Sequence, residues 1–433
     1  MIATRQIITK HFAIIILIFI IGAYLVIKAI PENSWDGWSV ASAQTLLSIK
    51  HWTEDGFFNN YLLFLPQGYS KTVRYFDEPE LRQHSRGITT GGFVGKRLYY
   101  THYPSGYLLF PALLMKLGID NRFWFRFFEI IMSLSGLIIL YCIFNMISSR
   151  FIAILGVFFY GLSTLFLDYA DIISNQPIDE LLRFVVILFS IIALKNHKKY
   201  LNYFIWVFYF LAFMSSYDSA IFLFAWLIGI DILFNKKFNW QLWIFWASAP
   251  ILGFALQMIQ NAAYLGIHGM ILDLLGTFKV QILGSRSGFF ISHFKRLTDP
   301  FDWFFGVKWY LGILISILGI AVVKFIKKHL SNDILDLRFL YLGFTAMLFH
   351  FLFFPSLFFY QGRIIAIFGG LLVGILTTTL IKEIISLFKT NITIQRCIVV
   401  FGIFILVSGL WFIQGKRTYA YIKNWPNNTW PAE

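Results

Sequence analysis

The sequence predicts an all-α polytopic membrane protein with about eleven transmembrane helices. Its 433 residues are 58% hydrophobic and only 13% charged, whereas a soluble domain usually carries about 25% charged residues. The fifty Phe and fourteen Trp residues provide more aromatic surface than one water-soluble core could bury. Lipid is therefore expected to be the main solvent of this chain.

The formal net charge of +14 would raise the question of nucleic acid in a soluble protein. In a membrane protein, Lys and Arg collect in cytoplasmic loops, and this explanation suffices, so no nucleic-acid partner is predicted. Cys142 and Cys397 both fall in apolar stretches, which argues against a disulfide framework. No His or Cys spacing indicates a metal site.

The candidate spans are mainly apolar stretches, since a hydrocarbon core about 30 Å thick requires about 20 apolar residues per helix. The first span follows Arg5 and Lys10 and lacks a small-residue cleavage site, so it is expected to remain as an anchor with a cytoplasmic N-terminus. The two short spans within 201–234 could instead form one re-entrant pair. The expected spans are 12–30, 122–147, 151–168, 181–195, 201–216, 219–234, 240–262, 308–326, 337–355, 363–381 and 397–414.

Basic residues predict the side on which each connection lies, because short cytoplasmic connections are rich in Lys and Arg. The long segments then fall on the opposite side: a first outer loop at 31–121 and a second large outer segment at 263–307. Recognition or chemistry is expected there, within a single transmembrane domain, 1–433, that has no soluble C-terminal domain. The basic residues used are Arg150, Lys195, Lys198, Lys199, Lys236, Lys237, Lys324, Lys327 and Lys328.

The first outer loop is expected to contain two amphipathic interfacial helices. One is predicted by five residues at helical spacing, with tryptophan as its membrane anchor. The other, at 103–118, is too short to span the bilayer and contains prolines. Between them, "RGITTGGFVGKRLYY" (86–100) has the composition of a flexible linker. The five residues are Trp38, Ala41, Thr45, Ile49 and Trp52.

Asp36, in "SWDGW", lies just where the chain leaves the first span. It could cap the helix that begins near Trp38, or it could act as a general base at the membrane surface. Its position alone does not separate these two roles.

A second group of acids lies in "LDYADIISNQPIDELLR" (167–183). Acidic groups that cluster near a membrane are usually functional, and Asp171 is preferred as a second catalytic acid, with Asp179 as the alternative. Asp179 and Glu180 are expected to precede a helix and could simply favour its dipole. Asp218 is expected in a solvated turn.

The stretch "GGFVGKR" does not fit a phosphate loop, because Thr90 stands where that pattern needs Gly and Arg97 where it needs Ser or Thr. Its glycines could still let the chain bend so that Lys96 and Arg97 meet a lipid phosphate. Ordinary contact with anionic headgroups is the alternative for these two cations. His102 taken alone would more often be a structural histidine than a ligand.

Taken in order, the first span, "SWDGW", "HWTEDGFFNN" and "YTHYPSGYLL" resemble the GT-C glycosyltransferases, which include the protein O-mannosyltransferases and the lipid A aminoarabinose transferases. The resemblance covers about residues 12–195 by motif and the remainder by helix layout. It implies that Asp36 takes the place of the catalytic acid and "THYPSGYLL" that of a Pro-containing segment. Gly37 stands where a second acid is common, which puts a paired-carboxylate role in doubt. His102 and Tyr103 stand where a lysine is common.

The resemblance further implies transfer of a sugar from a polyprenyl-phosphate donor to a hydroxyl group of a glycan, lipid or protein acceptor, with inversion. Asp36 would accept the proton, and the leaving phosphate would be stabilised by cations. A divalent cation is left open as a cofactor, since family members differ. The expected location is a bacterial cytoplasmic membrane, with the site on the periplasmic face. A polymerase or ligase of lipid-linked glycans and a transporter or flippase of lipid-linked sugars are the alternatives. The expected phosphate-binding residues are Lys96, Arg97, His102 and Arg363.

Overall fold

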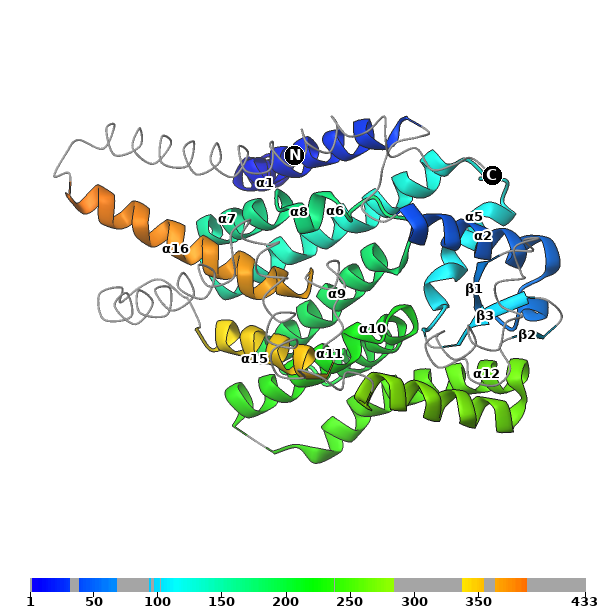
Figure 1. Cartoon of the computed structure of the whole chain (residues 1–433). Coiled ribbons are helices and arrows are strands. Elements are labelled where there is room, and N and C mark those ends of the chain that lie inside the picture. Colours follow the sequence, from blue (N-terminus) through cyan, green and yellow to red (C-terminus); the bar gives the residue numbers. More distant parts are fainter. Residues whose placement is uncertain are drawn as a thin grey trace.

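The computed structural model describes residues 2–31, 39–67, 93–94, 97–101, 103–236, 238–283, 337–353 and 363–387. Four helical segments in these ranges are long and apolar enough to cross a membrane: His11–Ala29, Arg122–Ile147, Asp218–Asn235 and Trp240–Leu275. Together with the composition they indicate an integral membrane protein with a mainly helical fold (Figure 1). The expected number of about eleven spans is not confirmed, and the expected spans 308–326 and 397–414 lie outside the described residues.

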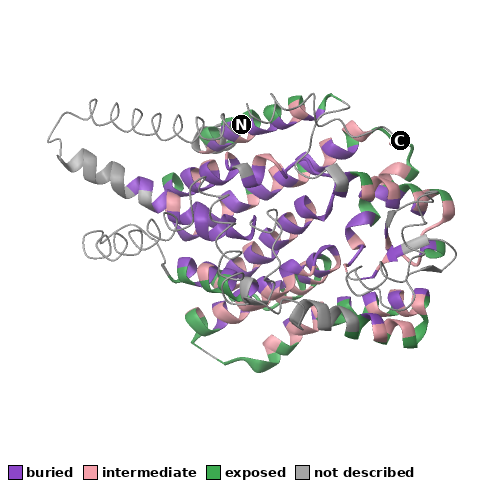
Figure 2. Ribbon diagram, in the orientation of Figure 1, coloured by how far each residue is buried: buried purple, intermediate pink, exposed green. Residues whose placement is uncertain are grey.

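The main body is a helix bundle whose core lies between helices that are distant in the sequence. One face of the first helix remains exposed, with Phe19 at 75% and Ile27 at 67%, as expected of a helix that faces lipid (Figure 2). Elements of the bundle are α1 (Ile2–Ala29), α6 (Arg122–Ile147), α7 (Arg150–Gly161), α8 (Thr164–Leu167), α9 (Asn175–Asn196), α10 (Leu201–Ser215), α11 (Asp218–Ile230), η4 (Asp231–Asn235), α15 (Leu337–Phe353) and α16 (Ala366–Leu387).

The expected span 151–168 is divided into α7 and α8. Ser163 lies at the break, where its hydroxyl donates to the Tyr160 carbonyl at 2.6 Å and accepts from the Phe166 amide at 3.3 Å. Serine favours such a position because its side chain replaces the missing backbone partners at a helix end. The break therefore ends α7 at the level of Tyr160, which belongs to the charged cluster described below.

Glycines bring α16 into close contact with α7. A Cβ atom on Gly156 would lie 3.0 Å from the Gly370 carbonyl oxygen, and one on Gly374 would lie 2.8 Å from the Ile152 carbonyl oxygen. Small residues at such an interface let two helix backbones approach closely in a membrane. This contact holds the start of α16, and Arg363 just before it, against the bundle.

Helix α12 (Trp240–Leu283) runs well beyond the expected span 240–262. It kinks at Gly266, whose φ of 73° is left-handed and is readily adopted only by glycine. The first part of the expected outer segment 263–307 is therefore helical, and the rest lies outside the described residues. The part of α12 around the kink packs against the first outer loop, where Gln260 Nε2 donates to the Leu62 carbonyl at 3.3 Å.

The first outer loop contains a small antiparallel sheet, so the all-α prediction is wrong for this region. Its strands are β1 (Phe64–Gln67), β2 (Phe93–Val94) and β3 (Arg97–Tyr100), in the order β1-β3-β2, with Phe64 opposite Tyr100 and Val94 opposite Arg97. The linker predicted at 86–100 thus includes two strands. The apolar and aromatic residues of this stretch favour a paired, half-buried strand, and this preference outweighs the flexibility of its glycines.

The helix predicted near Trp38 is confirmed as α2 (Ser39–Asp55); Trp38 itself lies outside the described residues, and Trp52 is not a membrane anchor. Trp52 is 1% exposed, and its Nε1 donates to the Leu63 carbonyl at 2.9 Å. Ala41, Thr45 and Ile49 are also buried, so this face packs against protein. The rest of the loop comprises η1 (Phe58–Asn60), η3 (Gly106–Leu108) and α5 (Leu109–Lys116). The last two form the short segment predicted at 103–118.

Candidate functional site

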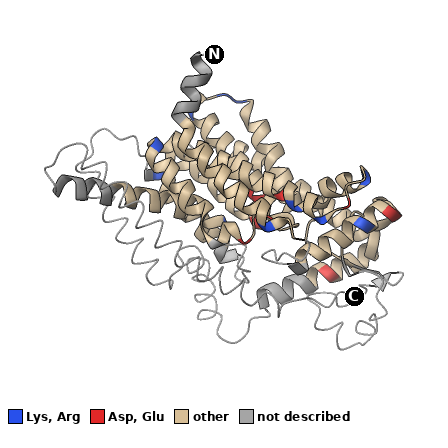
Figure 3. Cartoon of the chain, turned by 90° about the horizontal axis from the view of Figure 1, so that it is seen from above, with Lys and Arg blue, Asp and Glu red and all other residues tan. Residues whose placement is uncertain are grey.

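Charged residues lie close together at one end of the bundle, called here the charged end, where α1 and α7 finish and α6, α9 and α11 begin (Figure 3). Charges placed among apolar helices are costly unless they are paired or hydrogen-bonded, and in membrane proteins they commonly mark a functional site. All of them are buried except Lys28, whose side chain is 18% exposed. The cluster comprises Lys28, Arg126, Glu129, Asp171, Asp179, Glu180, Arg183, Asp218 and Arg363.

Asp171 joins α1 and α6 to the loop between α8 and α9. It has no exposed surface; its Oδ1 accepts from Lys28 Nζ at 2.8 Å and its Oδ2 accepts from the Arg126 guanidinium. Lys28 Nζ also donates to the Leu167 carbonyl at 3.0 Å. Both carboxylate oxygens are therefore engaged by cations.

Arg363 forms a bidentate ion pair with Glu180, at 2.6 Å from Nε and 2.9 Å from Nη2. Its Nη1 donates to the Tyr169 carbonyl at 3.1 Å, and the Tyr160 hydroxyl donates to Glu180. Each guanidinium nitrogen thus already donates to a protein oxygen. This geometry fixes the start of α16 to α9, and a phosphate would have to compete with a carboxylate for Arg363.

Glu129 lies three residues after Arg126 on α6 and is 4% exposed. Among the described residues, no hydrogen-bond partner is found for its Oε2. Arg363 is the cation that acts on Glu129 electrostatically. One carboxylate oxygen of Glu129 therefore accepts no hydrogen bond from the described residues.

Asp179 pairs with Arg183 on the same helix, and its Oδ1 accepts from the Ser219 hydroxyl of α11. Arg183 Nε donates to the same hydroxyl at 3.0 Å. The prediction that Asp179 and Glu180 precede a helix is wrong. Helix α9 begins at Asn175, so both acids lie beyond its first turn, where the helix dipole has little effect.

Tyr103, in the segment "THYPSG", connects this segment to the charged end by hydrogen bonds. The Tyr103 hydroxyl is 2.6 Å from the Ser216 hydroxyl, accepts from Asn175 Nδ2 at 2.9 Å and donates to Asp218 Oδ2 at 3.2 Å. Asp218 is 4% exposed, so the prediction of a solvated turn is wrong. A Cβ atom on Gly106 would lie 2.6 Å from the Met214 carbonyl oxygen, so this close approach requires glycine.

Helix α12 contacts Thr101, the first residue of this segment, and Tyr99 just before it. The Thr101 hydroxyl donates to Asp273 Oδ2 at 2.6 Å, and Asn261 Nδ2 donates to the Thr101 carbonyl at 3.0 Å. Tyr264 of α12 packs edge-on against Tyr99 at 4.9 Å between ring centroids. The backbone on either side of position 102 is therefore fixed from two directions.

The pKa of Tyr169, in the loop that contains Asp171, is raised by burial and further by the Asp168 carboxylate. Its phenol is therefore expected to stay neutral at physiological pH.

The residues that the structure describes include no group of three or more His, Cys, Asp or Glu side chains able to hold a metal ion.

Three of the predicted site residues, Asp171, Asp179 and Arg363, come together at the charged end. Arg97 lies in β3, where only its backbone is described. The remaining three, Asp36, Lys96 and His102, lie outside the described residues. The roles assigned to all seven stay predictions.

Sequence reasoning missed Lys28, Arg126 and Glu129. The signal for two of them was present, because an Arg and a Glu three residues apart occupy one face of an otherwise apolar helix. Ionisable residues within a span are functional candidates by default. Lys28 gave a weaker signal, because a lysine near a helix end usually reaches the interface.

No protein-family model and no curated protein matches this chain. Among solved structures, the oligosaccharyltransferase of Archaeoglobus fulgidus, tethered to an acceptor peptide, is similar with 12% sequence identity and a TM-score of 0.44. The similarity covers 94% of this chain and 55% of that one, so the present chain spans about half the length of that structure.

Proposed function

We propose that this protein is a membrane glycosyltransferase that moves a sugar from a polyprenyl-phosphate donor to a hydroxyl acceptor, with its site at the charged end facing the outer side of the membrane. One observation carries the proposal: Tyr103, in the segment whose order and composition resemble the GT-C pattern, is hydrogen-bonded to Asn175 and Asp218, the first residues of α9 and α11. A segment that merely rested on the membrane surface would not need three buried polar partners.

The proposed reaction is a displacement at the anomeric carbon. The acceptor oxygen attacks that carbon while its proton passes to the Asp36 carboxylate. The bond between the anomeric carbon and the donor phosphate oxygen breaks, and its electron pair stays on the leaving polyprenyl phosphate. Lys96, Arg97 and His102 are proposed to stabilise the charge that develops there. An attack from the side opposite the phosphate inverts the anomeric centre.

The paired charges at this end are proposed to act as positioning residues. The ion pairs of Asp171 and of Arg363 fix the helix ends around the loops, which favours a preorganised site. Arg363 is also proposed to bind the donor phosphate while it remains paired with Glu180. Asp171 is likewise proposed as the second acid, with Asp179 as the alternative, and its ion pairs give it a positioning role.

The proposal is tested by measuring sugar release from a panel of polyprenyl-phosphate sugars by the purified full-length protein. Asp36→Asn is expected to abolish release without loss of folding, because the change is nearly isosteric. Asp120→Asn, an exposed acid of the same loop, is the matched control and should release sugar like the wild type.

Release from one donor by the wild type and the control, but not by Asp36→Asn, would support the proposal and identify the sugar. Equal release by all three proteins would leave Asp36 as a helix cap and remove the proposed base. No release from any donor by a well-folded wild type in the presence of acceptor glycans, lipids and peptides would contradict the reaction class itself.

A further inference from the structure

A cavity of about 860 Å³ lies at the opposite end of the bundle, called here the cavity end. It is formed where α9 ends, α10 begins, α11 passes into η4 and α12 begins. Small-molecule sites usually have volumes of about 300–1,000 Å³, so this one is large enough for more than a single ion. It is separate from the charged end, because α9, α10 and α11 run between the two.

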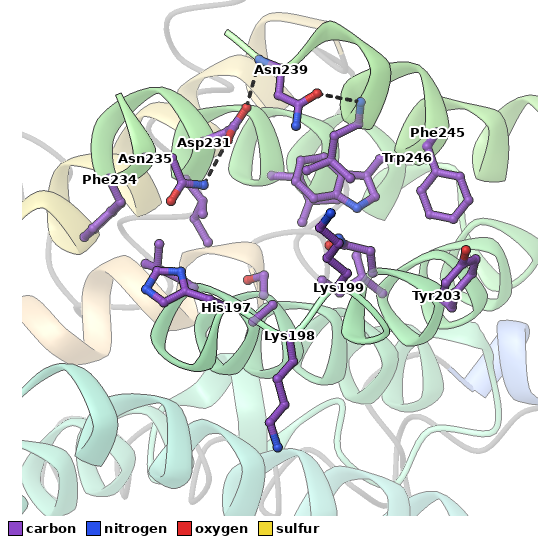
Figure 4. A pocket seen from close by; sticks show the side chains of 18 of the residues that line it. His197, Lys198, Lys199, Tyr203, Asp231, Phe234, Asn235, Asn239, Phe245 and Trp246 are labelled. Carbon is purple, nitrogen blue, oxygen red and sulfur yellow. Dashed lines mark hydrogen bonds between the residues drawn. The ribbon is translucent and has the colours of Figure 1, made fainter. Parts of the chain in front are cut away.

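The lining combines apolar walls with a basic rim. Ile205, Leu227 and Phe245 are among its apolar residues, and His197 and Lys199 come from the turn that joins α9 to α10. Figure 4 shows Lys199 extending between the helices toward Asn239 and Trp246, while Lys198, which also lines the cavity, extends in the opposite direction. Lys198 Nζ instead lies 5.8 Å from the Tyr200 ring centroid.

One acidic residue, Asp231, also lines the cavity, and both of its carboxylate oxygens accept hydrogen bonds from the protein. Its Oδ1 accepts from Asn235 Nδ2 at 2.9 Å, and its Oδ2 accepts from Trp243 Nε1 at 2.9 Å and from the Asn239 amide at 3.3 Å. These contacts lie in and beside η4, a π-helical turn of the kind that often marks functional sites. Asp231 therefore organises the wall and does not require Lys199 as its partner.

Trp246 supplies the observation that points to a ligand. This residue is 4% exposed and lines the cavity, yet its Nε1 donor has no hydrogen-bond partner in the part of the chain that the structure describes. A buried donor without an acceptor is costly, and the indole N–H can only donate. An acceptor that enters the cavity would satisfy it.

We propose that this cavity binds a phosphate-bearing group, with Lys199 as the ionic partner, Trp246 Nε1 as a buried hydrogen-bond donor and His197 at the rim. The apolar walls and the volume favour the headgroup and upper chains of a phospholipid over free phosphate. Exposed aromatic residues beside the entrance, Tyr203 at 66% and Trp240 at 58%, are typical of the level of lipid headgroups. This inference does not depend on the proposed function.

The test is a calorimetric titration of the full-length protein in detergent with three probes. These are dihexanoyl phosphatidylglycerol below its micelle concentration, inorganic phosphate, and dihexanoylglycerol, which has the chains but no phosphate. We expect the phospholipid to bind with one site per chain. Lys199→Ala should weaken this binding about tenfold or more, as loss of a charge-assisted hydrogen bond usually does.

Lys195→Ala is the matched control, because it removes the same charge near the end of α9 from an exposed side chain that does not line the cavity and whose Nζ donates to the Met146 carbonyl; it should change the affinity by less than about twofold. Trp246→Phe should weaken binding several-fold, and Lys199→Arg should restore most of the affinity lost in Lys199→Ala. Thermal unfolding of each variant checks that its fold is kept.

Binding of inorganic phosphate as tightly as the phospholipid would support the anion site and assign it to free phosphate. Equal binding of dihexanoylglycerol and the phospholipid would overturn the proposal, because the chains alone would then explain it. Absence of binding by both phosphate-bearing probes would also overturn it, as would equal losses for Lys195→Ala and Lys199→Ala.

Discussion

The two ends of the bundle use charge in opposite ways, although α9 and α11 contribute to both. At the charged end, the first turns of α9 bury Asn175, Asp179, Glu180 and Arg183; Asp179 pairs with Arg183 of the same helix and Glu180 with Arg363. At the cavity end, the same helix finishes in exposed residues around His197, and Lys199 faces a cavity. Position along one helix thus separates charges that hold elements together from charges that are available to a ligand.

The difference follows from the cost of moving charge out of water. A buried ion pair is retained only with good geometry and additional hydrogen bonds, and removing one partner leaves an uncompensated charge. An exposed cation has no such constraint and can exchange water for a ligand. The comparison therefore predicts large effects on stability at the charged end and small ones at exposed positions.

The strongest test of this comparison removes Glu180, the partner of Arg363. Glu180→Ala should lower the free energy of unfolding by about 3–5 kcal/mol, because it leaves a buried guanidinium without its carboxylate. The measurement is denaturant unfolding in mixed micelles. The matched control is Glu54→Ala, which breaks an exposed pair with Lys50 at 3.8 Å and should cost less than about 1 kcal/mol. Similar losses in both variants would remove the distinction between buried and exposed charge.

A double-mutant cycle sharpens the same point at Asp171. Asp171→Asn and Lys28→Met should each destabilise the protein, and the double variant should lose less than the sum, with a coupling energy of about 1–3 kcal/mol. The free energies of unfolding of the four proteins give this value. Combining Lys28→Met with Asp179→Asn, which pairs elsewhere, should give no comparable coupling. Additive effects for Lys28 and Asp171 would contradict the ion pair.

Packing at the charged end is tested by Gly106→Ala. Its new methyl group would lie 2.6 Å from the Met214 carbonyl oxygen, so the Tyr103 segment must shift, at a cost of about 1–3 kcal/mol. Gly343→Ala in α15 is the control, since its methyl group would meet nothing closer than 3.5 Å and should be tolerated. Equal thermal unfolding of both variants and the wild type would show that the segment is not tightly held.

The helices that sequence reasoning found best are those whose apolar length is a local property, such as α1, α6 and α15. The α2 helix was also predicted from the spacing of its apolar residues. What its buried face packs against was not, because a face that contacts protein and a face that contacts lipid are both apolar. The sheet was missed because β1 and β3 are short and pair across an intervening segment.

The candidate site was predictable only in its components. An Arg and a Glu within α6 are visible in the sequence as charges inside a span. The Arg363–Glu180 pair joins residues 183 positions apart, and no local pattern assigns two such residues to each other. Sequence reasoning therefore named three members of the charged end, Asp171, Asp179 and Arg363, but not the pairing of Arg363 with Glu180.

The smallest effect expected at the charged end comes from a single oxygen atom. Tyr103→Phe keeps the ring but removes the hydroxyl that Ser216, Asn175 and Asp218 share. Leaving buried polar groups with one partner fewer should cost about 1–2 kcal/mol in unfolding free energy. Tyr203→Phe, at an exposed tyrosine beside the cavity end, should change stability by less than about 0.5 kcal/mol.

The outcome of this comparison also bears on the proposed function, because the two variants make the same chemical change at opposite ends. If Tyr103→Phe lowers sugar transfer while a protein of equal stability, such as a mild core variant, does not, the hydroxyl orients the segment for the reaction. If transfer falls only in proportion to the loss of folded protein, the network around Tyr103 serves stability alone. The charged end would then hold the bundle together, and the chemistry would have to reside in other residues of the first outer loop.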